Sequence, residues 1–350
     1  MESLHQIPGV SLTRHIRDDL TRMTGRWPEG KIFLIFEKNT FQYCWPLLRG
    51  FRPLDETRFI ILRAGEPNKG IGQVVRAWEL LGKRGLDRGS LVINVGGGML
   101  TDLGGFVAST IKRGVEFINI PTSLLAMVDA SVGGKSGINF RGLKNEVGVI
   151  REPLHVLIHL PFLRTLDSRE LLSGYAEMLK AGLIADRTLW EKLRYHQPGA
   201  FAEELMEELV WHSVLVKKGI VDLDLQEAGP RKALNFGHTI GHAFESEALR
   251  RGQPVPHGFA VAWGMIYEAR LSGLKLGLTE RSIREITDTV TEIYGPVPKD
   301  LLNPGQLIPW MRSDKKNIDN QLNFTLLEEV GRSRVNCTAT EQELHPLLSS

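Results

Sequence analysis

The stretch LVINVGGGMLTDLGGF, residues 91–106, decides the expected fold. Its first five residues form a short apolar run typical of a buried strand, and three glycines lead from that run into a helix. Glycines at such a junction let backbone N–H groups approach a diphosphate, and the helix N-terminus adds partial positive charge. The pattern is not GxGxxG, so the ordinary dinucleotide fingerprint is absent. A tight strand-to-helix turn without a ligand is the alternative.

Similar short apolar runs flank this stretch. Lys31–Phe36, Arg58–Leu62 and Val115–Pro121 each predict a strand, and Ile71–Lys83 has apolar residues at helical spacing. Strands separated by helices predict an α/β domain with a parallel sheet.

Polar turns follow two of these strands. Gly65–Lys69 comes after the second strand and Pro121–Leu124 after the fourth. Ligands of open α/β sheets bind at the carboxyl ends of strands, so these turns and the three glycines could line one crevice. Asp102 could hold ribose hydroxyls there or cap a helix.

The pattern of apolar residues changes after about residue 153. Helical spacing predicts five long helices, at residues 169–184, 201–221, 234–249, 260–276 and 280–294. Little strand signal precedes Asn323–Leu327. The length of 350 residues favours two domains. We therefore predict an α/β domain over residues 1–152 and a mostly α-helical domain over residues 153–350.

The composition is that of a soluble globular protein, with 42% hydrophobic and 24% charged residues. Lys+Arg 43 against Asp+Glu 41 gives +2, which does not support a nucleic-acid or membrane partner. Two distant cysteines, Cys44 and Cys337, fit a reducing cytoplasm. The start MESLHQIPGV has no apolar segment after a basic start, so no signal peptide is expected. Glycine is in excess, at 36 residues. We expect several of these glycines where phosphates bind: Gly96–Gly98, Gly104, Gly105, Gly133 and Gly134.

A second glycine-rich segment is VDASVGGKSGINFRGLKNEVG, Val128–Gly148. Lys135 and Lys144 stand among its glycines, and Asn145 adjoins them. Backbone N–H groups and ammonium groups both attract phosphate, so this segment suits an anionic substrate. A surface loop with solvated lysines is the alternative.

Three histidines and a glutamate suggest a metal site. His238 and His242 lie four residues apart and share one helix face, His257 precedes the next helix, and Glu177 lies on an earlier helix. The pattern is not HExxH. Two histidines and a carboxylate with an open position would form a catalytic zinc site and leave one histidine for proton transfer, although spacing does not say which. A Glu177–Lys180 pair and ordinary core or surface histidines are the alternatives.

Scattered basic residues would suit a small multiply anionic substrate, although each alone could be a solvated charge. They are Arg113, Lys180, Lys217, Arg231, Lys315 and Lys316.

Eight motifs in order resemble one family, the 3-dehydroquinate synthases among the sugar-phosphate cyclases. They are GGGMLTDLGGF, KRGVEFINIPTSLL, VDASVGGKSGIN, GLKNEVG, GYAEMLK, RKALNFGHTIGHAFE, HGFAVAWGM and DKKN. The resemblance extends from about Lys31 to Leu327. It implies an NAD-binding α/β domain, a helical metal domain and a homodimer.

The resemblance also implies roles for single residues. Glu177, His238 and His257 would bind Zn²⁺ or Co²⁺, and His242 would relay protons near the substrate phosphate. The substrate would be held by Lys135, Asn145, Lys180, Lys217, Arg231, Asn235 and Lys315, with Lys316 as an alternative to Lys315 and with Arg113 reaching the partner subunit's site. NAD would be contacted by Glu66, Lys69, Gly97, Gly98, Asp102, Thr122, Ser123, Asp129 and Lys144.

The implied reaction belongs to the shikimate pathway. 3-Deoxy-D-arabino-heptulosonate 7-phosphate is oxidised transiently by NAD, loses phosphate, is reduced again, and closes its carbocycle by an intramolecular aldol step. NAD is regenerated, so the net reaction is that of a lyase. Glu37 stands where the family commonly has Asp, which leaves Glu37 and Asn39 as weaker NAD candidates, and Thr122-Ser123 replaces the usual Thr-Thr.

Three other readings remain open. A related cyclase would act on sedoheptulose 7-phosphate, and a metal-dependent polyol dehydrogenase would consume NAD. A non-catalytic nucleotide-binding protein is the third.

Overall fold

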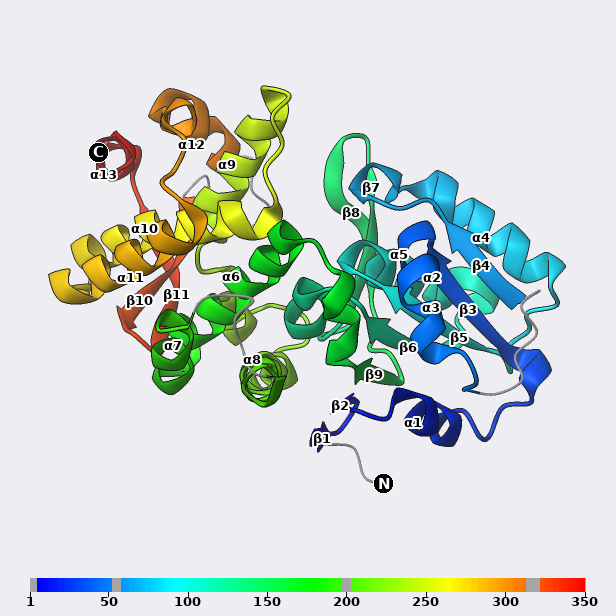
Figure 1. Ribbon diagram of the computed structural model, residues 1–350. Coiled ribbons are helices and arrows are strands. Elements are labelled where there is room, and N and C mark those ends of the chain that lie inside the picture. The colour runs from blue at the N-terminus through cyan, green and yellow to red at the C-terminus, as the bar shows by residue number, and fades with distance from the viewer. Residues whose placement is uncertain (1–4, 52–57, 197–202, 313–321, 350) are drawn as a thin grey trace. The chain divides into compact units, whose positions relative to one another are not determined.

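A computed structural model describes residues 5–51, 58–196, 203–312 and 322–349 (Figure 1). The chain divides into two compact units, Met1–Asp167 and Ser168–Ser350. The first contains a mostly parallel sheet with helices and the second is largely helical, which confirms the predicted fold class. The expected boundary after residue 152 falls inside the first unit, because residues 155–158 form a further strand of its sheet.

The first unit is built on a seven-stranded sheet with the order β1-β2-β9-β6-β5-β3-β4. β1 pairs antiparallel with β2, and every other neighbouring pair is parallel. The strands are β1 His5–Ile7, β2 Val10–Leu12, β3 Ile32–Glu37, β4 Phe59–Leu62, β5 Leu91–Gly96, β6 Glu116–Pro121 and β9 His155–Ile158. All residues of β3 and β5 are buried, as expected for central strands covered on both faces.

Three strands of this sheet, β1, β2 and β9, were not predicted from the sequence. Each has only three or four residues, too few to show a periodic pattern. β9 pairs with both β2 and β6, so it belongs to the first unit although it lies beyond residue 152.

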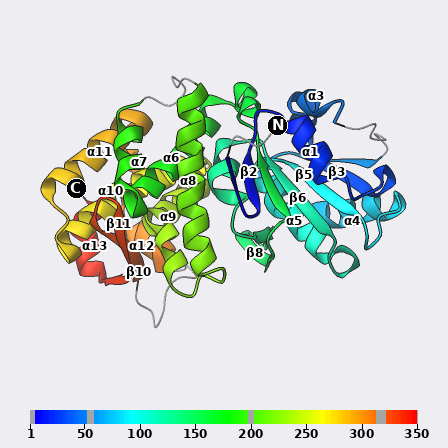
Figure 2. The same cartoon turned by 90° about the horizontal axis from the view of Figure 1, so that it is seen from below.

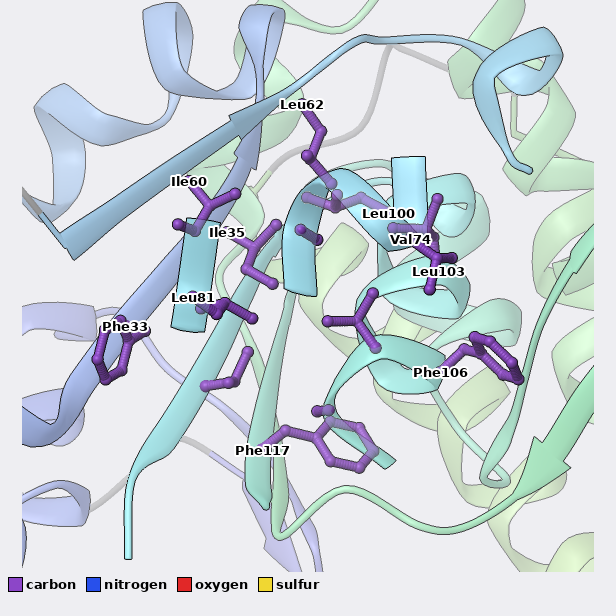
Figure 3. Close-up of a cluster of buried hydrophobic side chains, with 14 of the residues drawn as sticks. Phe33, Ile35, Ile60, Leu62, Val74, Leu81, Leu100, Leu103, Phe106 and Phe117 are labelled. Carbon is purple, nitrogen blue, oxygen red and sulfur yellow. The ribbon is translucent and has the colours of Figure 1, made fainter. Parts of the chain in front are cut away.

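Two helices supply much of the core of this unit. Figure 3 shows Phe33, Ile35 and Ile60 from the strands facing Val74 of α4 and Leu100 of α5. The helices of this unit are α1 Ile16–Met23, α2 Lys38–Tyr43, α3 Trp45–Leu48, α4 Ile71–Lys83 and α5 Gly98–Thr110.

Gly104 and Gly105 lie inside α5 and are buried, so they do not line a phosphate site as expected. A Cβ on Gly104 would lie 2.1 Å from Asn94 Oδ1, and one on Gly105 would lie 2.2 Å from Ser136 Oγ. These glycines are therefore needed for the close packing of α5.

The second glycine-rich segment is an ordered hairpin rather than an irregular loop. A short π-helical turn at Ala126–Ala130 leads through Gly133 and Gly134, both at positive φ, into β7. β7 Lys135–Phe140 pairs antiparallel with β8 Leu143–Ile150.

The second unit consists mainly of helices, and Figure 2 shows the long α8 lengthwise beside α6 and α7. Its elements are α6 Ser168–Ala185, α7 Arg187–Arg194, α8 Glu203–Leu223, α9 His238–Arg250, α10 His257–Leu276, α11 Glu280–Tyr294, α12 Pro304–Arg312, β10 Leu322–Glu329, β11 Arg332–Ala339 and α13 Glu341–Leu348. The five expected helices are present, while α7, α12, α13 and β11 were not anticipated. Among the described residues, no helix is long and apolar enough to cross a membrane.

Two predicted helix starts are wrong. The helix expected from residue 260 begins at His257, which is its first residue rather than one that precedes it. The helix expected from residue 234 begins at His238, because Pro230–Asn235 is a 3₁₀ helix and Gly237 adopts a left-handed φ of 79°.

Candidate functional site

Three helices of the second unit approach closely through glycines. A Cβ on Gly264 of α10 would lie 2.1 Å from the carbonyl oxygen of Gly237 and 2.7 Å from the nitrogen of Gly241. At the start of α10, a Cβ on Gly258 would lie 2.1 Å from the carbonyl oxygen of Ser173 on α6. The missing side chains therefore let α6, α9 and α10 meet backbone to backbone.

This approach gathers the predicted metal ligands. Glu177 Oε1 lies 3.6 Å from His238 Nε2 and 3.7 Å from His257 Nε2. One ligand atom from each of these side chains lies within 4.8 Å of the other two, which suits a single metal ion. The three residues come from three different helices, so their sequence spacing alone could not establish the group.

Hydrogen bonds orient both histidine rings. His238 Nδ1 donates to the carbonyl oxygen of Phe236 at 3.1 Å, and His257 Nδ1 faces Glu245 Oε2 at 3.5 Å. Since these oxygens accept hydrogen bonds, Nδ1 carries the proton and the Nε2 lone pair of each ring is left toward Glu177. Acceptors on the second nitrogen are the usual partners of metal-binding histidines.

The environment of Glu177 also fits a cation. Its side chain is 2% exposed, and buried Lys180 forms an ion pair with Oε2. Within the described part of the chain, Oε1 has no hydrogen-bond donor although it is buried. A buried carboxylate oxygen without a donor is costly, and a divalent ion at this position would satisfy it.

His242 lies beside the group. Its ring centroid is 5.3 Å from that of His238 and 5.8 Å from that of His257. His242, Glu245 and His257 could also hold a metal by their mutual distances. The Glu177 group fits better, because it supplies the oxygen that lacks a donor and leaves His257 Nδ1 to Glu245.

Three predicted substrate cations are buried in this unit: Lys180, Lys217 and Arg231. Arg231 Nη1 donates to the carbonyl oxygen of Leu225 at 2.6 Å. Asn235 Nδ2 donates to Glu227 Oε1 at 2.6 Å. Glu227 was not singled out from the sequence, because an acid in a polar loop carries no motif of its own.

In the first unit, predicted cofactor residues form a polar network. Lys69 Nζ, which is buried, lies 2.6 Å from Asp102 Oδ2 and 2.5 Å from Asn145 Oδ1. Burial raises the pKa of Asp102, and the Lys69 ammonium opposes that shift. Glu66 accepts a hydrogen bond from Asn139, a residue that sequence analysis missed.

The carboxyl ends of β5 and β6 lie side by side and bring more of the predicted residues together. The Thr122 N–H donates to the carbonyl oxygen of Gly96 at 3.0 Å. A Cβ on Gly97, the N-cap of α5, would lie 3.2 Å from Ser123 Oγ. A Cβ on Gly98 would lie 3.2 Å from the Cβ of Ala130, which follows Asp129. The two glycines therefore let this turn pack closely against Ser123 and Ala130, and they place the N-terminus of α5 at the carboxyl end of β5.

Several predicted residues lie outside these groups. Lys135 and Lys144 are exposed on the β7–β8 hairpin, and Arg113 is exposed at a φ of 69°. Glu37 forms a capping box with Thr40 at the start of α2, the helix that contains Asn39. Lys315 and Lys316 lie outside the described residues.

Fold and site together define a class of protein in which an α/β unit with a glycine-rich strand-to-helix turn precedes a helical unit with a Glu–His–His group. A solved structure of 2-epi-5-epi-valiolone synthase from Streptomyces hygroscopicus subsp. jinggangensis, with NAD⁺ and Zn²⁺ bound, has a similar fold. Its TM-score is 0.84 at 24% identity, over 99% of this chain and 98% of that one.

Family profiles are more specific. The 3-dehydroquinate synthase N-terminal profile matches residues 59–173, and the C-terminal profile matches residues 174–317. The chain belongs to the 3-dehydroquinate synthase family, as the sequence motifs predicted. A 3-dehydroquinate synthase from Parabacteroides distasonis is 41% identical over 335 residues, 96% of this chain and 95% of its own. One from Rhodococcus opacus is 41% identical over 270 residues, 76% of this chain and 72% of its own.

Proposed function

We propose that this chain is a carbon–oxygen lyase that converts 3-deoxy-D-arabino-heptulosonate 7-phosphate into 3-dehydroquinate and phosphate, with NAD and a divalent metal, Zn²⁺ or Co²⁺. The observation that carries the proposal is the group formed by Glu177, His238 and His257, in a chain of this family. When bound, the metal would polarise a substrate hydroxyl as a Lewis acid and NAD would accept and return a hydride.

Buried cations supply the substrate-binding part of the proposal. Lys180, Lys217 and Arg231 are at most 8% exposed, so water screens them weakly. A small acid with a phosphate and a carboxylate offers anionic groups that lysine and arginine side chains bind through charge-assisted hydrogen bonds. Fixed cations also stabilise negative charge that develops during the reaction, without reorganising at that moment.

His242 is suited to proton transfer because it adjoins the metal group without completing it. Its ring is half-buried, and histidine is the side chain that most often transfers protons in active sites. We propose that His242 holds a proton beside the departing phosphate.

The Lys69 network and the turn at Gly97 are proposed to hold NAD. Asp102 offers a carboxylate oxygen to ribose hydroxyls, and the N-terminal N–H groups of α5 face a diphosphate favourably. Thr122, Ser123 and Asp129 adjoin this turn, whereas Lys135 and Lys144 would reach their ligands from the hairpin.

The test is phosphate release from the heptulosonate phosphate by purified protein with NAD and Zn²⁺, with absorbance of NADH recorded in parallel. We expect stoichiometric phosphate and 3-dehydroquinate with no net NADH. Steady NADH accumulation would indicate a polyol dehydrogenase, and release only from sedoheptulose 7-phosphate would indicate the related cyclase. With neither signal, the proposal is wrong.

We further propose that the enzyme works as a homodimer in the cytoplasm. Arg113 is exposed and so is available to a partner's site. Light scattering should give twice the mass of the chain. If Arg113 reaches the partner's site, mixing Arg113→Ala subunits with Lys180→Ala subunits should give more activity than either variant alone.

A further inference from the structure

A fully buried glutamate on α10 is bonded to the start of α9. Glu268 is 0% exposed, Oε2 accepts a hydrogen bond from the Gly237 N–H at 2.6 Å, and Oε1 accepts one from the Ile240 N–H at 3.1 Å. Between these two donors stands His238, the first residue of α9.

Ordinary helix capping is impossible here. The N-cap residue is Gly237, at a φ of 79°, and a Cβ there would lie 2.6 Å from Met265 Cγ and 2.9 Å from the Val261 carbonyl oxygen. No serine, threonine or aspartate can therefore occupy the N-cap. The N-cap and third-residue N–H groups are those that a capping box satisfies, and Glu268 accepts from both of them from the neighbouring helix.

The carboxylate suits this place electrostatically. Backbone N–H groups at a helix N-terminus carry partial positive charge, and hydrogen bonds to a charged acceptor are stronger than neutral ones. Glu268 therefore fixes the position of the first turn of α9 relative to α10.

We propose that Glu268 is a positioning residue for the metal centre. It holds the first turn of α9 so that His238 Nε2 stays 3.6 Å from Glu177 Oε1. α10 then contributes to the centre twice, because it carries the ligand His257 at its start and secures His238 through Glu268. The inference rests on the proposed function only in that the Glu–His–His group binds a divalent ion.

The test compares Glu268→Gln with Glu247→Gln. Glu247 is also 0% exposed, but it lies on α9 and pairs with Arg250 and Arg251. A glutamine at 268 has one acceptor oxygen in place of two and turns an N–H₂ toward a backbone donor. Both variants should lower the melting temperature.

Metal affinity separates the two roles. We expect Glu268→Gln to lower the affinity for Zn²⁺ about tenfold or more in chelator competition. Substitution of residues that orient metal ligands typically lowers metal affinity by this much. Glu268→Gln should also alter the visible absorption of the Co²⁺-loaded protein, whereas Glu247→Gln should leave affinity and spectrum unchanged. Equal Zn²⁺ affinity in wild type and Glu268→Gln would overturn the proposal.

A second measurement does not depend on a variant folding. If Glu268 links the first turn of α9 to the metal centre, Zn²⁺ must slow hydrogen exchange at the Gly237 and Ile240 amides by the reciprocal coupling. Unchanged exchange at both amides upon Zn²⁺ saturation would refute the link. Neither readout uses the substrate, so a wild type that binds Zn²⁺ but releases no phosphate would refute the proposed reaction and not this inference.

Discussion

Replacing Gly264 by alanine tests whether the backbone contact between α9 and α10 builds the metal centre. The new Cβ would lie 2.1 Å from the Gly237 carbonyl oxygen, whereas an ordinary contact begins at 3.4 Å. The two helices must therefore separate by about 1.3 Å, the difference between these distances. Because the nearest atoms belong to backbone, no flexible side chain can absorb the change.

The expected loss has two parts. Overpacking of a well-packed core costs about 1–3 kcal/mol. For a unit of this size that lowers the melting temperature by about 2–12 °C, at about 2–4 °C for each kcal/mol. Metal–ligand distances tolerate deviations of only about 0.2 Å. If His238 and His257 move apart by more than that, the affinity for Zn²⁺ should also fall strongly.

The assay is thermal unfolding with and without Zn²⁺, together with Zn²⁺ affinity by chelator competition. Gly219→Ala is the matched control, since Gly219 lies inside α8 with nothing within 4 Å of its Cβ position. That change should stabilise the protein by about 0.5–1 kcal/mol. A Gly264→Ala protein as stable as Gly219→Ala, with wild-type Zn²⁺ affinity, would refute the reasoning.

Three further predictions concern a proposed metal ligand, the Lys69 network and the buried carboxylate of Glu247. His257→Ala should lose bound metal and phosphate release together, measured by metal analysis and a phosphate assay; a retained metal would contradict its assignment as a ligand. Lys69→Met should raise the Kd of NAD about tenfold or more in a fluorescence titration, since it removes a charged partner from Asp102; an unchanged Kd would separate this network from NAD. Hydrogen bonds from Arg250, and then Arg251 and Trp310, lower the pKa of Glu247 from 4.5 to about 2. The stability that Glu247 contributes is thus complete above pH 4.5 and is lost as the pH falls toward 2, so Glu247→Gln should flatten acid unfolding in that window, followed by circular dichroism.

The sequence predicted the parallel sheet because its central strands are continuous apolar runs separated by a helical segment. β3 and β5 each have six buried residues, enough to be distinguished from a helix by their flanking turns. β1, β2 and β9 were missed because a strand of three or four residues has no period to detect. Pairing with distant neighbours makes them strands, and pairing is not visible in a local window.

The residue types of the metal group could be predicted from the sequence, but the histidines that belong to it could not be identified from spacing. A spacing of four residues places His238 and His242 on one helix face, and no local rule says which of them binds. The structure favours His238, because its Nε2 faces Glu177 Oε1 while its Nδ1 donates a hydrogen bond to the Phe236 carbonyl oxygen. The family resemblance supplied the same choice from motifs alone. Glu268 had neither kind of signal, because an isolated acid in an apolar helix resembles an exposed residue until its burial is known.

The glycine excess shows why geometry was harder to predict than chemistry. Gly97 stands at a strand-to-helix turn as the N-cap of α5, where we propose that backbone N–H groups meet the cofactor. Gly264 and Gly104 are inside helices, where a missing side chain lets another element approach to a distance that any Cβ would block. Glycines at turns and glycines at helix contacts cannot be distinguished by counting residues. Only those at helix contacts determine how far apart the ligand-bearing helices lie. The proposed metal ligands are therefore predictable from short motifs, whereas the distances between the helices that carry them depend on glycines outside the Glu–His–His group.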